Sequence, residues 1–122
     1  DRVNDKYIID ELFDDATTPS EALKCDIYEL DGNYHIEIDV PGFNKQSLKV
    51  EYINGYISVI GNRQPDANVK YIKKERFYGT YKREFYVGEV DVLRVNAKYR
   101  DGILSIVVPK SIKESPKTIT IK

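Results

Sequence analysis

The stretch that most constrains the fold is residues 96–109, NAKYRDGILSIVVP. Two short apolar runs flank Asp101-Gly102, a dipeptide that readily adopts the positive φ angles of a tight turn. Residues before the turn alternate between apolar and polar side chains, whereas residues 103–108 are apolar on both faces except at Ser105. The stretch therefore predicts a β-hairpin with one half-exposed strand and one buried strand.

A period of two recurs along most of the chain after Cys25. Because 122 residues suit one domain, a single β-sandwich or barrel would use the whole chain. We therefore predict an all-β fold. Strands are predicted over residues 26–30, 34–40, 47–53, 56–61 and 81–87, with turns at Asp31-Gly32-Asn33 and Asn54-Gly55.

Residues 71–77, YIKKERF, are predicted to form a strand with an unusual charge pattern. They follow a polar connection over residues 62–70 and carry four consecutive charged side chains. Such a strand is poorly suited to the centre of a sheet. It suits an exposed edge, or the edge of a partner's sheet.

Arg83 lies in phase with the apolar side chains of the strand predicted over residues 81–87. One interpretation is a solvated arginine at a strand end. The phase favours the other, a buried or interfacial guanidinium group, which needs a carboxylate or a carbonyl oxygen as its partner.

The first residues of the chain follow a different pattern. Ile8, Ile9, Leu12 and Phe13 recur at helical spacing, which predicts a short amphipathic helix, and a linker containing Pro19 follows. The helix would either dock on its own domain or act as a mobile adhesive arm, and the sequence leaves both alternatives open.

A pair of isoleucines follows a polar stretch at the other end of the chain. Ile119 and Ile121, on either side of Thr120, project to the same side of an extended segment. A polar tail has little reason to carry this pair unless a groove receives it, so we expect a docking groove.

Composition argues against several function classes. The net charge of −1 gives no basic footprint for nucleic acid, although Tyr, Lys and Arg interleave over residues 71–86. The charge is uneven, because residues 1–24 carry seven acidic and three basic side chains. Cys25 is the only cysteine, so no internal disulfide framework is possible and a reducing cytoplasmic location is expected. No apolar run approaches the ~18 to 20 residues that span a bilayer.

The residues for enzyme chemistry are also missing. His35 is the only histidine and lies on the polar face of its predicted strand, which indicates a surface residue rather than a metal ligand or general base. No serine sits in a Gly-x-Ser-x-Gly turn, and no glycine-rich loop could hold a phosphate. We therefore predict a protein that is not an enzyme and has no metal or other cofactor.

Five sequence features follow one another along the chain. They are Asp26-Ile27-Tyr28-Glu29; Val40-Pro41-Gly42-Phe43 with Leu48-Lys49-Val50; residues 57–63; Glu75-Arg76-Phe77-Tyr78-Gly79 with Arg83-Glu84-Phe85; and Ala97 to Leu104 with the terminal Ile-x-Ile. In this order they resemble the α-crystallin domain of small heat-shock proteins of the prokaryotic and plant type. The resemblance covers about residues 25–122, and the chain departs from the usual Leu-Pro after the middle strand, where it has Val87-Gly88.

The resemblance implies an immunoglobulin-like antiparallel β-sandwich over residues 25–109, with an N-terminal arm over residues 1–24 and a C-terminal extension over residues 110–122. It also implies an ATP-independent holdase chaperone that binds unfolding proteins and prevents their aggregation. Such a protein would form homodimers that assemble into larger homo-oligomers with exchangeable subunits, without nucleic acid or membrane partners.

The resemblance further implies roles for particular residues. The charged strand would cross to the partner's first strand, the tail would dock in a neighbour's groove, and the arm would bind clients. The dimer interface would comprise Tyr71, Ile72, Lys73, Arg76, Arg83, Ile27 and Tyr28; the tail Ile119, Thr120 and Ile121; the groove Leu48, Val50, Val95 and Ala97; and the arm Ile8, Ile9, Leu12 and Phe13.

One alternative belongs to a different class of function. A monomeric β-sandwich of the related CS co-chaperone type would bind one folded partner. It would need neither the Ile-x-Ile tail nor a strand crossing at residues 71–76.

Overall fold

Three tight turns of the same kind close the hairpins that the sequence predicts. In each, two consecutive residues have positive φ angles: Asp31 and Gly32, Asn54 and Gly55, and Asp101 and Gly102. Asn and Asp tolerate this backbone conformation and glycine adopts it freely, so these dipeptides form turns whose twist matches that of the flanking strands.

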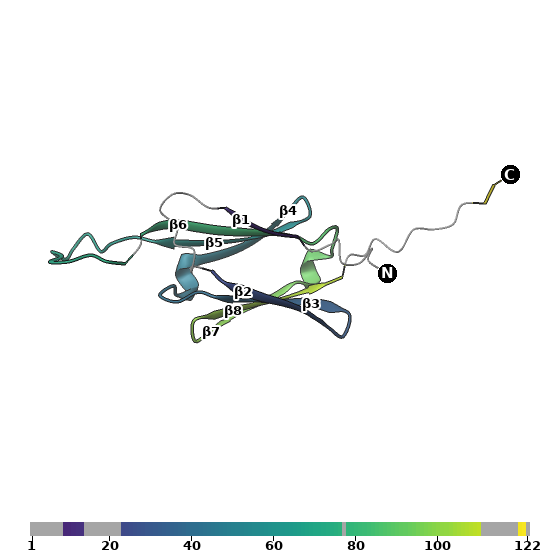
Figure 1. Cartoon of the computed structure of the whole chain (residues 1–122), viewed down its shortest axis with the longest axis horizontal. Helices are drawn as coiled ribbons and strands as arrows, with labels where there is room; N and C mark the ends of the chain where they lie inside the picture. Colours follow the sequence, from purple (N-terminus) through teal and green to yellow (C-terminus); the bar gives the residue numbers. More distant parts are fainter. Residues whose placement is uncertain (1–8, 14–22, 77, 111–119, 122) are drawn as a thin grey trace.

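The computed structural model describes residues 9–13, 23–76, 78–110 and 120–121. Two four-stranded antiparallel sheets pack face to face (Figure 1). This arrangement confirms the all-β sandwich. One sheet has the order β1 (Ile9–Phe13), β6 (Gly79–Tyr86), β5 (Tyr56–Arg63), β4 (Leu48–Ile53); the other has the order β2 (Cys25–Leu30), β3 (Asn33–Asp39), β8 (Ile103–Pro109), β7 (Asn96–Arg100).

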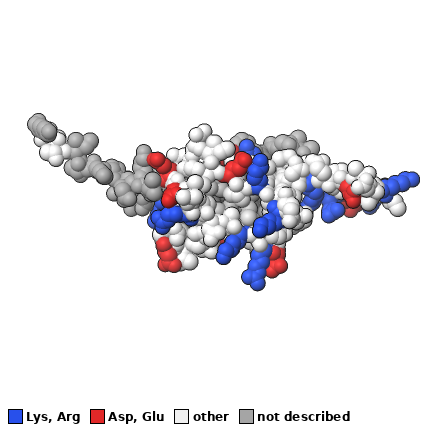
Figure 2. All heavy atoms as spheres, turned by 180° about the vertical axis from the view of Figure 1, so that it is seen from behind, with Lys and Arg blue, Asp and Glu red and all other residues white. Residues whose placement is uncertain are grey.

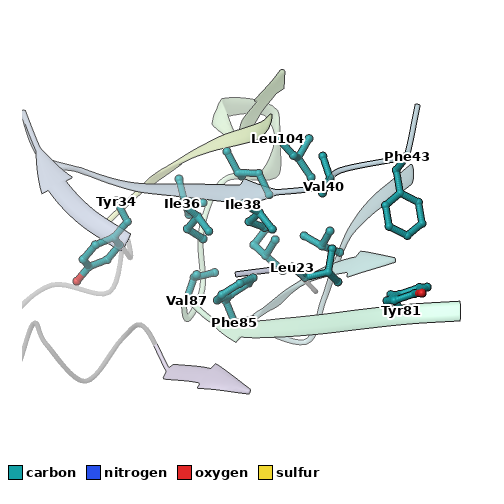
Figure 3. Packing of buried hydrophobic residues seen from close by; sticks show 14 of the residues in the cluster. Leu23, Tyr34, Ile36, Ile38, Val40, Phe43, Tyr81, Phe85, Val87 and Leu104 are labelled. Atoms are coloured by element: carbon teal, nitrogen blue, oxygen red, sulfur yellow. The ribbon is translucent and has the colours of Figure 1, made fainter. Parts of the chain in front are cut away.

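The core fills the space between the sheets with alternate residues of the central strands (Figure 3). On β3, for example, Ile36 and Ile38 are fully buried while Glu37 and Asp39 are exposed. This alternation is the period of two that the sequence shows. The fully buried side chains are Leu23, Ile36, Ile38, Val40, Ile57, Val59, Phe85, Val87, Ile106 and Val108.

Two short 3₁₀ turns follow the strands at the ends of the sandwich. In the turn Lys45–Ser47, the Asn44 side chain accepts from the backbone N–H of Ser47, and the Ser47 hydroxyl accepts from the N–H of Asn44, both at 3.0 Å. The turn Val92–Arg94 begins after Asp91, whose carboxylate accepts from the N–H of Leu93. None of the helices in the described residues could cross a membrane.

The helix predicted at the start of the chain is wrong for residues 9–13. These residues form β1, which pairs with β6 from Ile9 opposite Tyr86 to Phe13 opposite Lys82. An isolated helix this short is unstable in water, whereas the edge of β6 offers a row of backbone hydrogen-bond partners. Ile8 and the predicted linker over residues 14–22 lie outside the described residues.

The charged segment at residues 71–76 is not a strand of either sheet in the single chain. It belongs to the connection between β5 and β6, which projects away from the sandwich (Figure 1). Phe77 lies outside the described residues. The predicted strand is therefore not formed at residues 71–76, the part of it that the structure describes.

Candidate functional site

An apolar groove lies between the edge strands β4 and β7. It has a volume of about 210 Å³ and brings together Leu48, Val50 and Ala97, three of the four residues predicted to line a groove. Val95 does not line it, because Val95 ends the 3₁₀ turn before β7 and packs against the core. Among the described residues, the groove is lined by Lys45, Leu48, Val50, Ala97, Tyr99 and Leu104.

Three residues that line this groove, Lys45, Tyr99 and Leu104, were not predicted from the sequence. Tyr99 follows Ala97 at a spacing of two, so strand periodicity alone could have placed it on the same face. Leu104 is the partner of Tyr99 in the pairing of β7 with β8. The Tyr99 hydroxyl donates to the backbone oxygen of Phe43 at 2.7 Å, which holds the ring in place.

The tail residues that the structure describes do not occupy a groove of their own chain. Thr120 and Ile121 are exposed, with Ile121 retaining 94% of its accessible surface. Ile119 lies outside the described residues. Burial of an isoleucine this exposed against another apolar surface would be favourable.

Strand β2 forms one edge of its sheet. It pairs only with β3 within the described part of the chain, so its other side has no strand beside it there. Ile27 packs against the core, whereas Tyr28 is 44% exposed. The Tyr28 ring stacks on His35 at 4.9 Å between centroids, and its hydroxyl donates to Glu37 at 3.2 Å.

The surface around β2 is acidic. Strands β2 and β3 carry Asp26, Glu29, Glu37 and Asp39 and contain no Lys or Arg. Loss of hydration, the negative charge of Glu37 and the hydrogen bond to it raise the pKa of the Tyr28 hydroxyl above its usual value.

The projecting connection has the opposite charge. Figure 2 shows Lys and Arg side chains along it. Ile72 is fully exposed, Lys73 pairs with Glu75 at 3.0 Å, and the Lys74 ammonium lies 5.3 Å from the centre of the Tyr71 ring. Arg76 is exposed as well.

Arg83 is buried, as the phase of its strand indicated, with 9% of its surface exposed. Its Nη1 donates to the backbone oxygen of Leu23 at 2.6 Å, and its guanidinium lies 5.2 Å from the centre of the Phe85 ring. A carbonyl oxygen is thus one partner of this guanidinium group. Arg83 also lines a polar recess of about 550 Å³ with Lys24, Cys25, Asp26, Glu37, Asp39 and Ile103.

These surfaces offer open strand edges, an apolar groove and complementary charge. Among the described residues, no group of three or more His, Cys, Asp or Glu side chains is arranged to hold a metal ion. The interactions available at these surfaces are strand pairing and the burial of apolar side chains.

Comparison with known proteins identifies the family. The sequence model of the Hsp20/alpha crystallin family matches residues 26–122. The chain belongs to this family. Its members are small heat-shock proteins, so membership implies a chaperone function.

Curated relatives support the same assignment. The chain is 33% identical over 119 residues to the 18 kDa heat shock protein of Clostridium acetobutylicum, covering 93% of this chain and 79% of the relative. It is 35% identical over 112 residues to the heat shock protein HSP.16.4 of Streptococcus thermophilus, covering 88% and 78%. A maize 17.0 kDa class II heat shock protein is 33% identical over 108 residues, covering 83% and 70%.

Solved structures share the fold. A small heat-shock protein from Xylella fastidiosa, described as having a distinct high order structure, has a TM-score of 0.62 and 25% identity, covering 85% of this chain and 99% of that one. HSP18.5 from E. histolytica has a TM-score of 0.59 and 27% identity, covering 84% and 100%. The sandwich of this small heat-shock protein is therefore the α-crystallin domain.

Proposed function

We propose that this small heat-shock protein is an ATP-independent holdase that binds unfolding proteins in the cytoplasm and prevents their aggregation. It works as a dimer that assembles into larger homo-oligomers and exchanges subunits. The observation that carries the proposal is the apolar groove between β4 and β7, in a chain whose Ile121 is 94% exposed.

The groove would receive the Ile-x-Ile tail of a neighbouring subunit. Burial of Ile119 and Ile121 would contribute roughly 3 to 6 kcal/mol in gross terms, at about 1.5 to 3 kcal/mol for each side chain. Ordering of the tail and association of the subunits subtract several kcal/mol, so one tail binds weakly. A closed oligomer holds many tails at once, and each further contact is intramolecular.

The dimer would form by strand addition at β2. The connection over residues 64–76 projects away from the sandwich (Figure 1), and its basic side chains complement the acidic surface of β2 and β3. Ile72 would be covered there, together with Tyr71, Lys73 and Arg76 of one subunit and Ile27 and Tyr28 of the other. Strand addition supplies backbone hydrogen bonds that an open edge lacks.

Release of tails would expose the groove to clients. Unfolding proteins present apolar segments, which the groove can bind without nucleotide hydrolysis. The N-terminal residues Ile8, Ile9, Leu12 and Phe13 are proposed to add to this client-binding surface. Heat and dilution both favour released tails, so they are expected to shift the population toward smaller and more active species.

The test compares the wild-type chain with Ile119→Ala/Ile121→Ala. Native mass and suppression of client aggregation without ATP are measured on both. We expect a large oligomer for the wild type, dimers for the tail variant, and protection of clients by the wild type. The matched control is Val92→Ala/Leu93→Ala, which removes exposed apolar side chains from a turn outside the groove and should leave the native mass unchanged.

The dimer interface has its own test in the tail variant. Lys73→Glu/Lys74→Glu should convert dimers into monomers, whereas Lys98→Glu/Arg100→Glu on the exposed strand β7 should not. If the wild type and the tail variant both run as the same monomer and neither protects a client, the holdase proposal fails and a monomeric partner-binding module of the CS type replaces it.

A further inference from the structure

Lys110, at the root of the C-terminal extension, contacts the hairpin of β2 and β3 at three points. Its backbone N–H donates to Gly32 at 3.4 Å in the turn between β2 and β3. Its ammonium pairs with the carboxylate of Glu29 on β2 and lies 6.0 Å from the centre of the Tyr34 ring on β3. The side chain is only 31% exposed.

The residue before it is also held. Pro109 is buried and is the last residue of β8, where it pairs with Asn33 of β3. The backbone is therefore fixed by the sheet up to Pro109 and by the hairpin at Lys110. Rotation of the backbone at Pro109 and Lys110 would break the hydrogen bond, the ion pair and the ring contact together.

An isolated exposed ion pair would not hold a chain in one direction, because its stabilisation is small. Here the ammonium has a carboxylate on one strand and an aromatic ring on the next, and the same residue is tied by its backbone. A cation over an aromatic face is favoured most where the cation is partly shielded from water, as it is here. The three contacts restrain one another.

We propose that Glu29 and Tyr34 form a docking site for Lys110 that sets the direction in which residues 110–122 leave the sandwich. The effect on assembly rests on the proposed function, in which the tail joins subunits. A fixed direction raises the effective concentration of the tail at one neighbouring groove and lowers it at others. Lys110 is thus a positioning residue for assembly, and it has no part in the groove itself.

The site connects the open edge strand β2 with the start of the C-terminal tail, two parts of the chain that are far apart in the sequence. Glu29 lies on β2, the open edge strand, and Lys110 leads into the tail. Loss of either side chain should give the same result if they act as a pair. If Glu29 acts mainly in accepting a partner's strand, replacement of Glu29 and replacement of Lys110 should affect native mass and subunit exchange differently.

The first experiment measures the direction of the tail itself. Spin labels at Ser111→Cys and Lys98→Cys, in a Cys25→Ser background that also carries Ile119→Ala/Ile121→Ala, report one distance distribution when labelled chains are diluted with unlabelled ones. We expect a narrow distribution with Lys110 and a broad one with Lys110→Ala. Equal widths would overturn the proposal, whether or not the protein forms oligomers.

The second experiment measures the consequence for assembly in the full chain. Lys110→Ala and Glu29→Gln should each broaden the distribution of native masses and speed subunit exchange about two- to fivefold, the factor expected for one modest ion pair at each tail. Lys110→Arg and the exchanged pair Lys110→Glu/Glu29→Lys should return both readouts toward the wild type. When the tail isoleucines are also replaced, each of these Lys110 and Glu29 variants should still form dimers.

Two results separate this proposal from the others. If Glu29→Gln alone dissociates dimers while Lys110→Ala leaves mass and exchange unchanged, Glu29 belongs to the strand-accepting edge and the docking site is refuted. If the wild type itself is a monomer, the holdase proposal fails, and the distance distribution still decides whether Lys110 is docked.

Discussion

Replacement of Arg83 tests whether its guanidinium group stabilises the folded subunit or only the dimer. The structure gives the group a position inside one chain, since its hydrogen bond runs to Leu23, a residue that is 1% exposed. The resemblance to the family gives it a role between chains. The two roles predict different dependence on protein concentration.

The expected loss can be worked out for two substitutions. Arg83→Met keeps most of the apolar stem and removes the donor, which leaves the Leu23 oxygen buried without that hydrogen bond. A hydrogen bond from a charged group contributes about 1.5 to 3 kcal/mol, and relief of the buried charge offsets part of this, so we expect a loss of about 1 to 3 kcal/mol. Arg83→Ala also loses about two buried methylenes, for a total of about 3 to 5 kcal/mol.

The assay is urea unfolding of the variants in the Ile119→Ala/Ile121→Ala background, followed by circular dichroism at several protein concentrations. A contribution within the subunit lowers the free energy of unfolding equally at every concentration. A contribution only between subunits appears as a shift of the monomer–dimer equilibrium. Arg83→Met with an unfolding free energy within about 0.5 kcal/mol of the background, a typical value for a surface substitution, would refute the argument from burial.

Three smaller perturbations follow from contacts elsewhere. Gly61→Ala places a methyl group about 2.8 Å from the buried ring of Phe43, so thermal unfolding should show a loss of about 1 to 3 kcal/mol, and an unchanged midpoint would contradict the packing. Tyr52→Phe removes a hydroxyl that donates at 2.7 Å to the loop after β6 and should cost about 1 to 3 kcal/mol in urea unfolding, whereas a neutral result would mean that water replaces it. In an ultraviolet titration, Glu37→Gln should lower the raised pKa of Tyr28 toward 10.0. Because the pKa of Tyr28 is raised in the folded state, its contribution to stability should be complete at neutral pH and lost as the pH rises through the pKa of the folded state.

The strands and hairpins could be predicted because local signals and the final structure agree. Asp-Gly and Asn-Gly sit at turns whose φ angles they favour, and the period of two matches the burial along β3. The error at residues 9–13 arose because isoleucine and phenylalanine suit either structure, and the open edge of β6 decides between them. Periodicity carries no information about such an edge.

The groove was predicted only in part, because periodicity does not show where a strand begins. Leu48, Val50 and Ala97 come from the family resemblance, and the structure brings them together. Val95 shares their spacing but precedes β7, where the end of a 3₁₀ turn directs it toward the core. The sequence gives the spacing of residues within a strand but not the position at which a strand begins.

Strand propensity does not indicate which sheet edge the segment over residues 71–76 would join, but charge does. A strand can be added only at an edge, and the edges of the two sheets are β1, β2, β4 and β7. Strand β7 carries Lys98 and Arg100 without an acidic residue and would repel a basic segment, while β4 carries one charge of each sign. Strand β1 is acidic, but its neighbour β6 carries two cationic residues, Lys82 and Arg83, against one acidic residue, Glu84.

Strand β2 keeps an acidic surplus, because Lys110 pairs with Glu29 but β3 beside it adds Glu37 and Asp39. Coulomb attraction therefore favours β2 over the other three edges, and salt should weaken the preference because most of these charges face water. Reversal of charge at Asp26 should weaken dimers more than reversal at Asp10 on β1. If reversal at Asp10 weakens dimers more than reversal at Asp26, the dimer interface lies on β1 of the other sheet, and strand addition at β2 is wrong.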